Sequence, residues 1–470
     1  SDLLQRWREA VKENRSDILR AILLLGHADK DRYFRLFQDE NDKIVDAVVI
    51  EVMKEISYFS PKRKELKSFN LLATFPGTEE EIQCRHFVVH QQEVQKADPA
   101  LKFGYTQFKD LATIANHVKP DTEQKYARLK AQATETHLVD NRKFGAFLAE
   151  QFDAMEAGNK TSKLILIEST VHTMNLGLRI KDKNGQKVYV AKFFDPNLTN
   201  SDIRHASASL KTFESREVGT YIADDDCVKN YYPEPKGVSM AYVRPAATER
   251  HPPSLSLQGV DNRMLTTCID DKEVDGIVVW HLLSRGFAGN LRQLKEEIAS
   301  RPDAEKIALL SEKNDDGISG FNRAMQDGYA DVIKAYGELL HLIPENARTE
   351  LVAAKRDSDG APGLLMALQN GHAETINAYA ELLPLIPENA RAVLVAAKKA
   401  DGVSGMDAIL LRVDDNDLDN TIEAHGKLLS LIPQKARYDL LAAQINGTLS
   451  LKSALKNGNR KTVSRYIKLI

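Results

Sequence analysis

Cys84, His172 and Asp195 are the residues whose types and order along the chain could support nucleophilic catalysis. A thiol attacks a carbonyl carbon when an imidazole takes its proton, and a carboxylate can hold that imidazole in the required orientation. We expect His172 to begin one strand of a hairpin and Asp195 to end the partner strand, which places both at one edge of a sheet. The pair can therefore form a general base with its orienting acid.

The position of Cys84 counts against this interpretation. The order of the three residues is that of papain-like cysteine proteases, but residues 85–90 read Arg-His-Phe-Val-Val-His and predict a strand. A strand does not supply the positive helix end that lowers the pKa of a thiol. A papain-like protease is therefore kept as an alternative to the functions below.

His172 has two further interpretations. With Glu168 and Asp195 on either side, its imidazole could bind a ribose or polarise a substrate group. A histidine whose hydrogen bonds are satisfied within the edge of a sheet would show the same spacing. Sequence spacing does not separate these two interpretations.

Carboxylates form the last set of residues that could do chemistry. Transfer of a sugar from nicotinamide passes through an oxocarbenium-like state, which needs a carboxylate close to the developing positive charge. We expect most of the acidic candidates to be solvated; they are Glu214, Glu217, Asp224, Asp225, Asp226, Glu249, Glu273 and Glu312. Glu312 is the strongest of them, because it precedes Asp316-Gly317 and should lie on a turn that projects from the repeats described below.

The middle of the chain is predicted to be the α+β domain that positions these side chains. Apolar or alternating runs predict strands, and Asn184-Gly185 predicts a tight hairpin turn between two of them. The expected strands are residues 164–168, 172–180, 188–194, 220–223 and 238–243. Helices are expected from residue 101 to about residue 157, with a break at Pro120.

A dipeptide motif of Asp or Asn followed by Gly occurs five times in the C-terminal third of the chain. The occurrences are Asp275-Gly276, Asp316-Gly317, Asp359-Gly360, Asp401-Gly402 and Asn446-Gly447. Their glycines lie 41, 43, 42 and 45 residues apart. A helix, a glycine turn and a second helix follow, as in ankyrin repeats. A third segment, Leu-Ile-Pro-Glu-Asn-Ala-Arg at 342–348, recurs at 385–391 and predicts an extra helix. We therefore predict an ankyrin-like solenoid that binds another protein.

Length and composition bound the remaining possibilities. The chain has 470 residues, a net charge of -3 and 43% hydrophobic residues, which fits two or three globular domains and argues against nucleic acid as a partner. No run reaches the roughly 18 apolar residues of a membrane span. Cys84, Cys227 and Cys268 lack metal-type spacing, so we expect no metal and a reducing compartment. Because the chain opens on Ser1-Asp2, we also expect residues to have been removed before Ser1.

We predict three domains: a helical region at 1–60, an α+β catalytic region at 61–270 and the repeats at 271–470. Leu4, Trp7 and Val11 have helical spacing within a basic amphipathic segment. Such a segment with an aromatic anchor is typical of calmodulin targets and membrane-surface helices. An N-terminal core helix would have the same pattern.

The combination of the His172-Thr173-Met174-Asn175-Leu176 strand, the Phe193-Phe194-Asp195-Pro196-Asn197 turn and the long repeats resembles the CopC and OspC group of type III secreted effectors. The resemblance covers nearly the whole chain. It implies secretion by a bacterium into the host cell cytoplasm and a block of host cell death. It also implies ADP-riboxanation of a host caspase arginine from NAD, with release of nicotinamide and ammonia. Calmodulin would activate the enzyme, and the repeats would hold the caspase.

On this resemblance Glu312 would polarise the ribose or orient the arginine, and Asp195 would help to deprotonate the guanidinium. His172, Thr173 and Phe194 would contact NAD. The signatures of ADP-ribosyltransferases, a Ser-Thr-Ser strand and a Glu-x-Glu turn among them, are not clearly present. A non-enzymatic ankyrin adaptor with an α+β docking domain is the remaining alternative.

Overall fold

The computed structural model describes residues 58–59, 67–97, 105–214, 216–222, 225–233, 237–244, 275–410, 418–447 and 464. The chain divides into two compact units, one of Ser1–Leu255 with Thr266–Ile269 and the other of Ser256–Leu265 with Asp270–Ile470. Leu4, Trp7 and Val11, the expected calmodulin contacts, lie outside the described residues. No helix in the described part combines the length and the apolar character that a membrane crossing needs.

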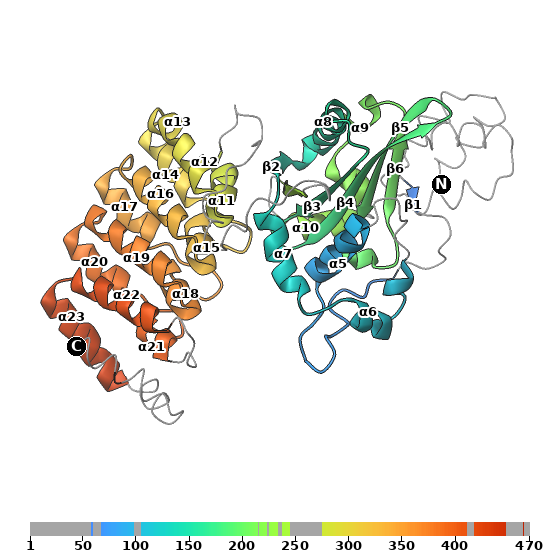
Figure 1. Cartoon of the computed structure of the whole chain (residues 1–470). Coiled ribbons are helices and arrows are strands. Elements are labelled where there is room, and N and C mark those ends of the chain that lie inside the picture. Colours follow the sequence, from blue (N-terminus) through green and yellow to red (C-terminus); the bar gives the residue numbers. More distant parts are fainter. Residues whose placement is uncertain are drawn as a thin grey trace, which may run out of the picture. The chain divides into compact units, whose positions relative to one another are not determined.

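The first unit is built on an antiparallel sheet of seven strands in the order β1-β6-β5-β4-β3-β7-β2, which confirms the α+β prediction (Figure 1). The strands are β1 (Tyr58–Phe59), β2 (Glu135–Asp140), β3 (Ser162–Glu168), β4 (Thr173–Lys183), β5 (Gln186–Phe194), β6 (Ile203–Ser207) and β7 (Val238–Val243). Its helices and 3-10 turns are α5 (Cys84–Ala97), η2 (Tyr105–Phe108), α6 (Leu111–His117), α7 (Thr122–Ala131), η3 (Asn141–Lys143), α8 (Phe144–Ala157), η4 (Pro196–Leu198), α9 (Lys211–Glu214), η5 (Val218–Tyr221) and α10 (Asp225–Tyr231).

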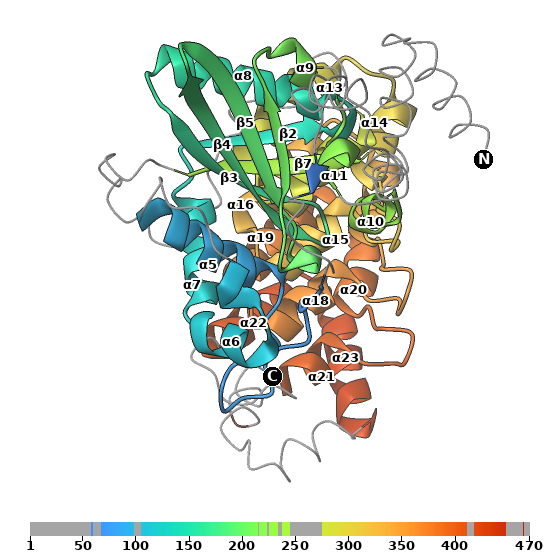
Figure 2. The ribbon, with the colours of Figure 1, turned by 90° about the vertical axis from the view of Figure 1, so that its right-hand side faces the viewer.

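Helices cover both faces of this sheet, with α8 and α5 on opposite sides (Figure 2). Alternate residues of β3, β4 and β5 pack with α8 in one apolar core, to which Phe144, Phe152 and Leu176 belong. Residues of the other face meet α5 and η2, where Phe194 stacks on Phe108. Because both faces are covered, a side chain is reached from solvent mainly at the ends of the strands.

The hairpin of β4 and β5 was predicted from sequence and is confirmed. Asn184 and Gly185 join the strands with φ angles of 55° and 79°, the left-handed geometry that Asn-Gly turns provide. Asn175 pairs with Phe194, so the start of β4 lies beside the end of β5. This register brings residues 172 and 195 together at one end of these two central strands.

The predicted strand at residues 85–90 is wrong, because these residues belong to helix α5. His86, Phe87, Val88 and Val89 are all buried, so the apparent alternation does not separate an inner from an outer face. The helix packs on β4 and α7, and this burial outweighs the β preference of the two valines.

Two other local predictions also fail. Residues 135–140 were expected in a helix but form β2, which pairs with β7 about one hundred residues later in the chain. A strand was expected at residues 220–223, but residues 220 and 221 belong to the 3-10 turn η5, and residue 223 lies outside the described residues. Both differences depend on long-range contacts, which a local pattern does not contain.

In its described part the second unit has helices at the positions predicted for the repeats that begin at residues 275, 316, 359 and 401, and most of the fifth predicted repeat lies outside the described residues. The helices are α11 (Gly276–Ser284), α12 (Ala288–Gln293), α13 (Lys295–Ala299), α14 (Asp303–Ser311), α15 (Gly320–Asp327), α16 (Ala330–Leu340), α17 (Glu345–Val352), α18 (Gly363–Asn370), α19 (Ala373–Leu382), η7 (Leu383–Leu385), α20 (Glu388–Val395), α21 (Gly405–Leu410), α22 (Leu418–Ser430) and α23 (Gln434–Gly447). In one row α11, α15, α18 and α21 contact in turn, and in a second row α12, α16, α19 and α22 do so.

The turns between these helices explain the repeated residues. Gly328 ends α15 and Gly371 ends α18 with φ angles of 83° and 79°, in the left-handed conformation that favours glycine. Pro344 and Pro387 stand directly before α17 and α20, where a missing N–H costs nothing. The extra segment therefore lengthens each of these repeats by one short helix.

Candidate active site

Cys84 is the first residue of α5 and so stands at the positive end of that helix. The first N–H groups of a helix have no acceptor within it, and the Arg85 N–H lies within hydrogen-bond reach of the Cys84 thiol. The side chain is half-buried and is not part of a disulfide. The structure therefore supplies the helix terminus whose apparent absence argued against a catalytic cysteine.

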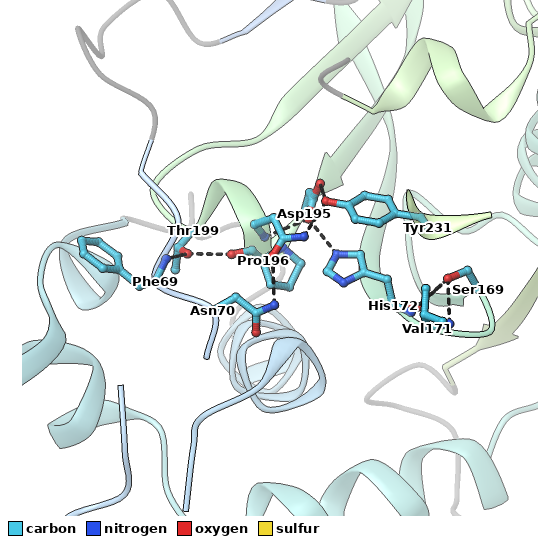
Figure 3. Close-up of polar contacts among 10 residues, drawn as sticks. Phe69, Asn70, Ser169, Val171, His172, Asp195, Pro196, Thr199 and Tyr231 are labelled. Carbon is cyan, nitrogen blue, oxygen red and sulfur yellow. Dashed lines mark hydrogen bonds and ion pairs between the residues drawn. The ribbon is translucent and has the colours of Figure 1, made fainter. Parts of the chain in front are cut away.

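His172 is held in a tight turn between β3 and β4. The backbone N–H groups of Val171 and His172 donate to Oγ of Ser169 at 3.2 and 3.0 Å, and the Ser169 N–H donates to the carbonyl of His172 at 2.9 Å (Figure 3). The imidazole is buried, whereas Val171 beside it is 56% exposed. The turn thus fixes the imidazole close to the surface of the unit.

Asp195 follows β5 and meets His172 across the hairpin. Nε2 of His172 donates to Oδ1 of Asp195 at 2.8 Å (Figure 3). Because Nε2 is occupied by the carboxylate, Nδ1 is the ring nitrogen left for another partner. The predicted meeting of these two residues is present in the structure.

The Cys84 thiol is within hydrogen-bond reach of the His172 imidazole, which completes a series of thiol, imidazole and carboxylate. Burial alone would raise the pKa of Cys84, but the bond to His172, its charge and the N–H groups of Thr173 and Arg85 lower it below its usual range. Burial disfavours the imidazolium, yet Asp195 and Cys84 raise the pKa of His172 to about 9. Both shifts favour the charged pair of thiolate and imidazolium over the neutral pair of thiol and imidazole.

Two more groups donate to the Asp195 carboxylate. The Asn197 backbone N–H donates to Oδ1 at 2.9 Å, and the Tyr231 hydroxyl donates to Oδ2 at 2.7 Å. The ring of Tyr231 also stacks on the His172 imidazole, with centroids 4.1 Å apart and planes inclined by 19°. Both oxygens of the acid and one face of the base are thus in contact with neighbouring groups.

The other residues proposed from sequence lie in different surroundings. The Thr173 N–H reaches the Cys84 thiol, and its hydroxyl faces that of Tyr126 at 3.4 Å. Phe194 is 2% exposed and packs in the core with Phe108 and Tyr105. Glu168, which was expected beside His172, is paired with Lys130 at 3.0 Å instead.

Glu312 belongs to the second unit, whereas His172 and Asp195 belong to the first. It follows α14 directly, and its carboxylate lies against Gly276 at the start of α11. Burial and the neighbouring Asp275 raise the pKa of Glu312. Its described neighbours are those of a turn between helices.

Tyr231 and Asn70 were not predicted from sequence, and Asn197 was quoted without a role; Nδ2 of Asn70 donates to Oδ1 of Asn197 at 2.9 Å. A signal existed for Asn197, since an N–H two residues after an aspartate often donates to that carboxylate. Nothing in the spacing of Tyr231 distinguishes it from other buried tyrosines. Within the described residues no group of three metal-binding side chains occurs.

Comparison with known proteins gives two matches. A family model described as the N-terminal region of the ShET2 enterotoxin matches residues 38–314, a span that includes Cys84, His172 and Asp195. A protein of Shigella flexneri named effector protease OspD3 is 28% identical over 292 residues, which cover 61% of this chain and 48% of that protein. The chain thus spans about half the length of this relative.

Proposed function

The chain belongs to the family of the ShET2 enterotoxin N-terminal region, and we propose that it is a cysteine protease whose nucleophile is Cys84. The observation that carries the proposal is the continuous series of the Cys84 thiol, the His172 imidazole and the Asp195 carboxylate. The placement of Cys84 at the start of α5 supports it, because the helix end favours the thiolate. The name of the relative, an effector protease, points to the same chemistry.

In the proposed reaction the Cys84 thiolate attacks the carbonyl carbon of a peptide bond, and the resulting oxyanion needs N–H donors nearby. The His172 imidazolium gives its proton to the departing amine, which leaves an acyl-enzyme thioester. His172 then takes a proton from water as that water attacks the thioester, and the acid product and the thiolate are released. Asp195 keeps the imidazole oriented and stabilises its charge through both proton transfers.

The substrate class that fits this proposal is a protein of a host cell, delivered to the enzyme by the helical unit. The stacked helices of that unit support a binding role, because the surfaces of helical repeats commonly bind other proteins. Secretion of the chain into the host cell belongs to the same proposal and is supported by the family and by the relative's name as an effector. A caspase, expected from the sequence resemblance, is one candidate target.

ADP-riboxanation with NAD and calmodulin stays a prediction from that resemblance. The matches found belong to the ShET2 family and to a protease, and not to the CopC and OspC group that the sequence suggested. Of the residues expected to bind NAD, Phe194 is enclosed by the core. The thiol chemistry is therefore the better supported of the two activities.

The test is a cleavage assay on host-cell lysate in which new protein N-termini are labelled and identified. We expect defined cleavages with the natural chain and at least a roughly 10³-fold loss with Cys84→Ala. Cys227→Ala is the matched control, because Cys227 is the other cysteine in the described part of the chain and, like Cys84, is not in a disulfide. Equal cleavage by the Cys84→Ala variant would overturn the proposal.

A second arm separates the alternatives. Purified caspases are incubated with the chain, NAD and calmodulin, with each omitted in turn, and their intact masses are measured. A caspase mass gain equal to ADP-ribose less ammonia, still seen with the Cys84→Ala variant, would establish the riboxanase activity instead. If the chain causes no cleavage and no mass change, the binding-only adaptor is the remaining alternative.

A further inference from the structure

We infer that Tyr231 is a positioning residue: with Asn197 and Asn70 it forms a relay of hydrogen bonds that holds Asp195 in the orientation His172 requires. The effect on cleavage rests on the proposed protease function. The effect on the Cys84 thiol does not, because thiol reactivity can be measured without a substrate.

The direction of the hydrogen bonds supports this role. Nδ2 of Asn70 donates to Oδ1 of Asn197 at 2.9 Å, and Nδ2 of Asn197 donates to the Tyr231 hydroxyl oxygen at 2.7 Å. That hydroxyl donates in turn to Oδ2 of Asp195 at 2.7 Å. Every donor thus points toward the carboxylate, so each bond polarises the next in the same sense.

The relay has a fixed far end. The Lys67 N–H donates to Oδ1 of Asn200 at 3.1 Å. The Phe69 N–H donates to Oγ1 of Thr199 at 2.9 Å (Figure 3). These bonds pin residues 67–70 to the turn that follows Asp195. The Leu71 N–H then donates to the carbonyl of Ile82 at 3.1 Å, two residues before the nucleophile. The same segment is therefore hydrogen-bonded both to the turn after Asp195 and to the residues just before Cys84, which helps to fix the position of Cys84 relative to Asp195.

Tyr231 is suited to this task in two ways. Its ring lies flat on His172 and limits rotation of the imidazole, while its hydroxyl fixes the carboxylate. Burial and the charge of Asp195 raise the pKa of Tyr231, so the phenol keeps its proton and remains a donor. One side chain thus restrains both the base and the acid.

The experiment compares Tyr231→Phe with Tyr221→Phe. Tyr221 is a buried tyrosine of the same unit whose hydroxyl has no hydrogen-bond partner among the described residues. In Tyr231→Phe we expect kcat for cleavage to fall about tenfold with KM within twofold, because the acid and not the substrate site is disturbed. Alkylation of Cys84 by iodoacetamide at pH 6.5 should slow severalfold. Tyr221→Phe should leave both within twofold of the natural chain.

A double-mutant cycle tests the relay as a unit. Asn70→Ala alone should lower kcat and the alkylation rate less than Tyr231→Phe does. Added to Tyr231→Phe, it should change them little further, since the link to Asp195 is already broken. Independent, multiplying effects of the two substitutions would contradict the relay.

The outcomes separate this inference from the protease proposal. If the natural chain cleaves nothing, the protease proposal fails, but slower Cys84 alkylation in Tyr231→Phe still supports the relay. If Tyr231→Phe matches Tyr221→Phe in both alkylation and kcat, the relay is wrong while Cys84-dependent cleavage stands. Circular dichroism and thermal unfolding establish that each variant is folded.

Discussion

The two units place tyrosines in their interiors for different purposes. In the first unit the Tyr231 hydroxyl donates to a carboxylate and accepts from an amide. In the second, Tyr336 is fully buried and its hydroxyl has no hydrogen-bond partner among the described residues. Its ring instead packs on Phe321, with centroids 4.7 Å apart. The same residue type is part of a polar network in one unit and apolar filling in the other.

The contrast is local to the site. Tyr221 lies in the same apolar core as Tyr231, yet its hydroxyl is without a partner in the described part of the chain. Removing one member of a buried, paired network leaves its partner unsatisfied and costs roughly 1–3 kcal/mol, whereas removing an unpaired hydroxyl need cost nothing. We therefore expect loss of the paired Tyr231 hydroxyl to matter at the proposed site, and loss of the unpaired Tyr221 hydroxyl to matter little.

The largest expected effect separates site from scaffold and comes from Asp195→Asn. The amide keeps the size of the carboxylate but carries no charge to stabilise the imidazolium, so cleavage should fall about 10³-fold. Initial rates of cleavage at fixed substrate concentration measure the loss. Asp182→Asn, at the exposed hairpin end, is the control. A loss below threefold would remove Asp195 from the catalytic group.

The next effect is on the second unit and should leave the site untouched. Phe321 is fully buried and contacts Tyr336 and Tyr379, so Phe321→Ala should lower the free energy of unfolding by about 3–5 kcal/mol. Denaturant unfolding followed by circular dichroism measures this. Iodoacetamide alkylation of Cys84 should remain within twofold in the absence of denaturant. A matching loss of thiol reactivity would show that the units depend on each other.

The pH dependence sharpens the description of the site. The pKa of His172 is raised to about 9, so the imidazolium is present below that pH and is lost as the pH rises through it. Because the leaving amine takes its proton from this imidazolium, kcat/KM should decrease about tenfold per pH unit above 9. Cleavage rates between pH 5 and 10.5 test this. A decline already complete near pH 7 would contradict the ion pair.

The smallest effect is expected in the repeats. Tyr336→Phe removes the unpaired hydroxyl and keeps the packed ring, so the free energy of unfolding should change by less than about 0.5 kcal/mol. Denaturant unfolding measures it beside Tyr336→Ala, which should cost several kcal/mol. A loss above 1.5 kcal/mol in Tyr336→Phe would mean that this hydroxyl has a partner, and the comparison of the two tyrosines would then fail.

Much of the helical unit could be predicted from its repeated residues. The glycines that end α15 and α18 and the prolines before α17 and α20 act on their own backbones, so their positions predict helix ends without tertiary information. The hairpin of β4 and β5 could be predicted for the same reason, from Asn184 and Gly185. Helix α5 could not be predicted in this way, since its buried face depends on packing against β4 and α7.

By itself the sequence determined the hairpin, and with it the meeting of His172 and Asp195, because register follows from a two-residue turn. It also determined the period of the repeats. Only the tertiary structure decided that Cys84 begins a helix beside His172 and that Tyr231 and Asn70 belong to the same site. These contacts join segments between 36 and 127 residues apart, and nothing in a local pattern records them.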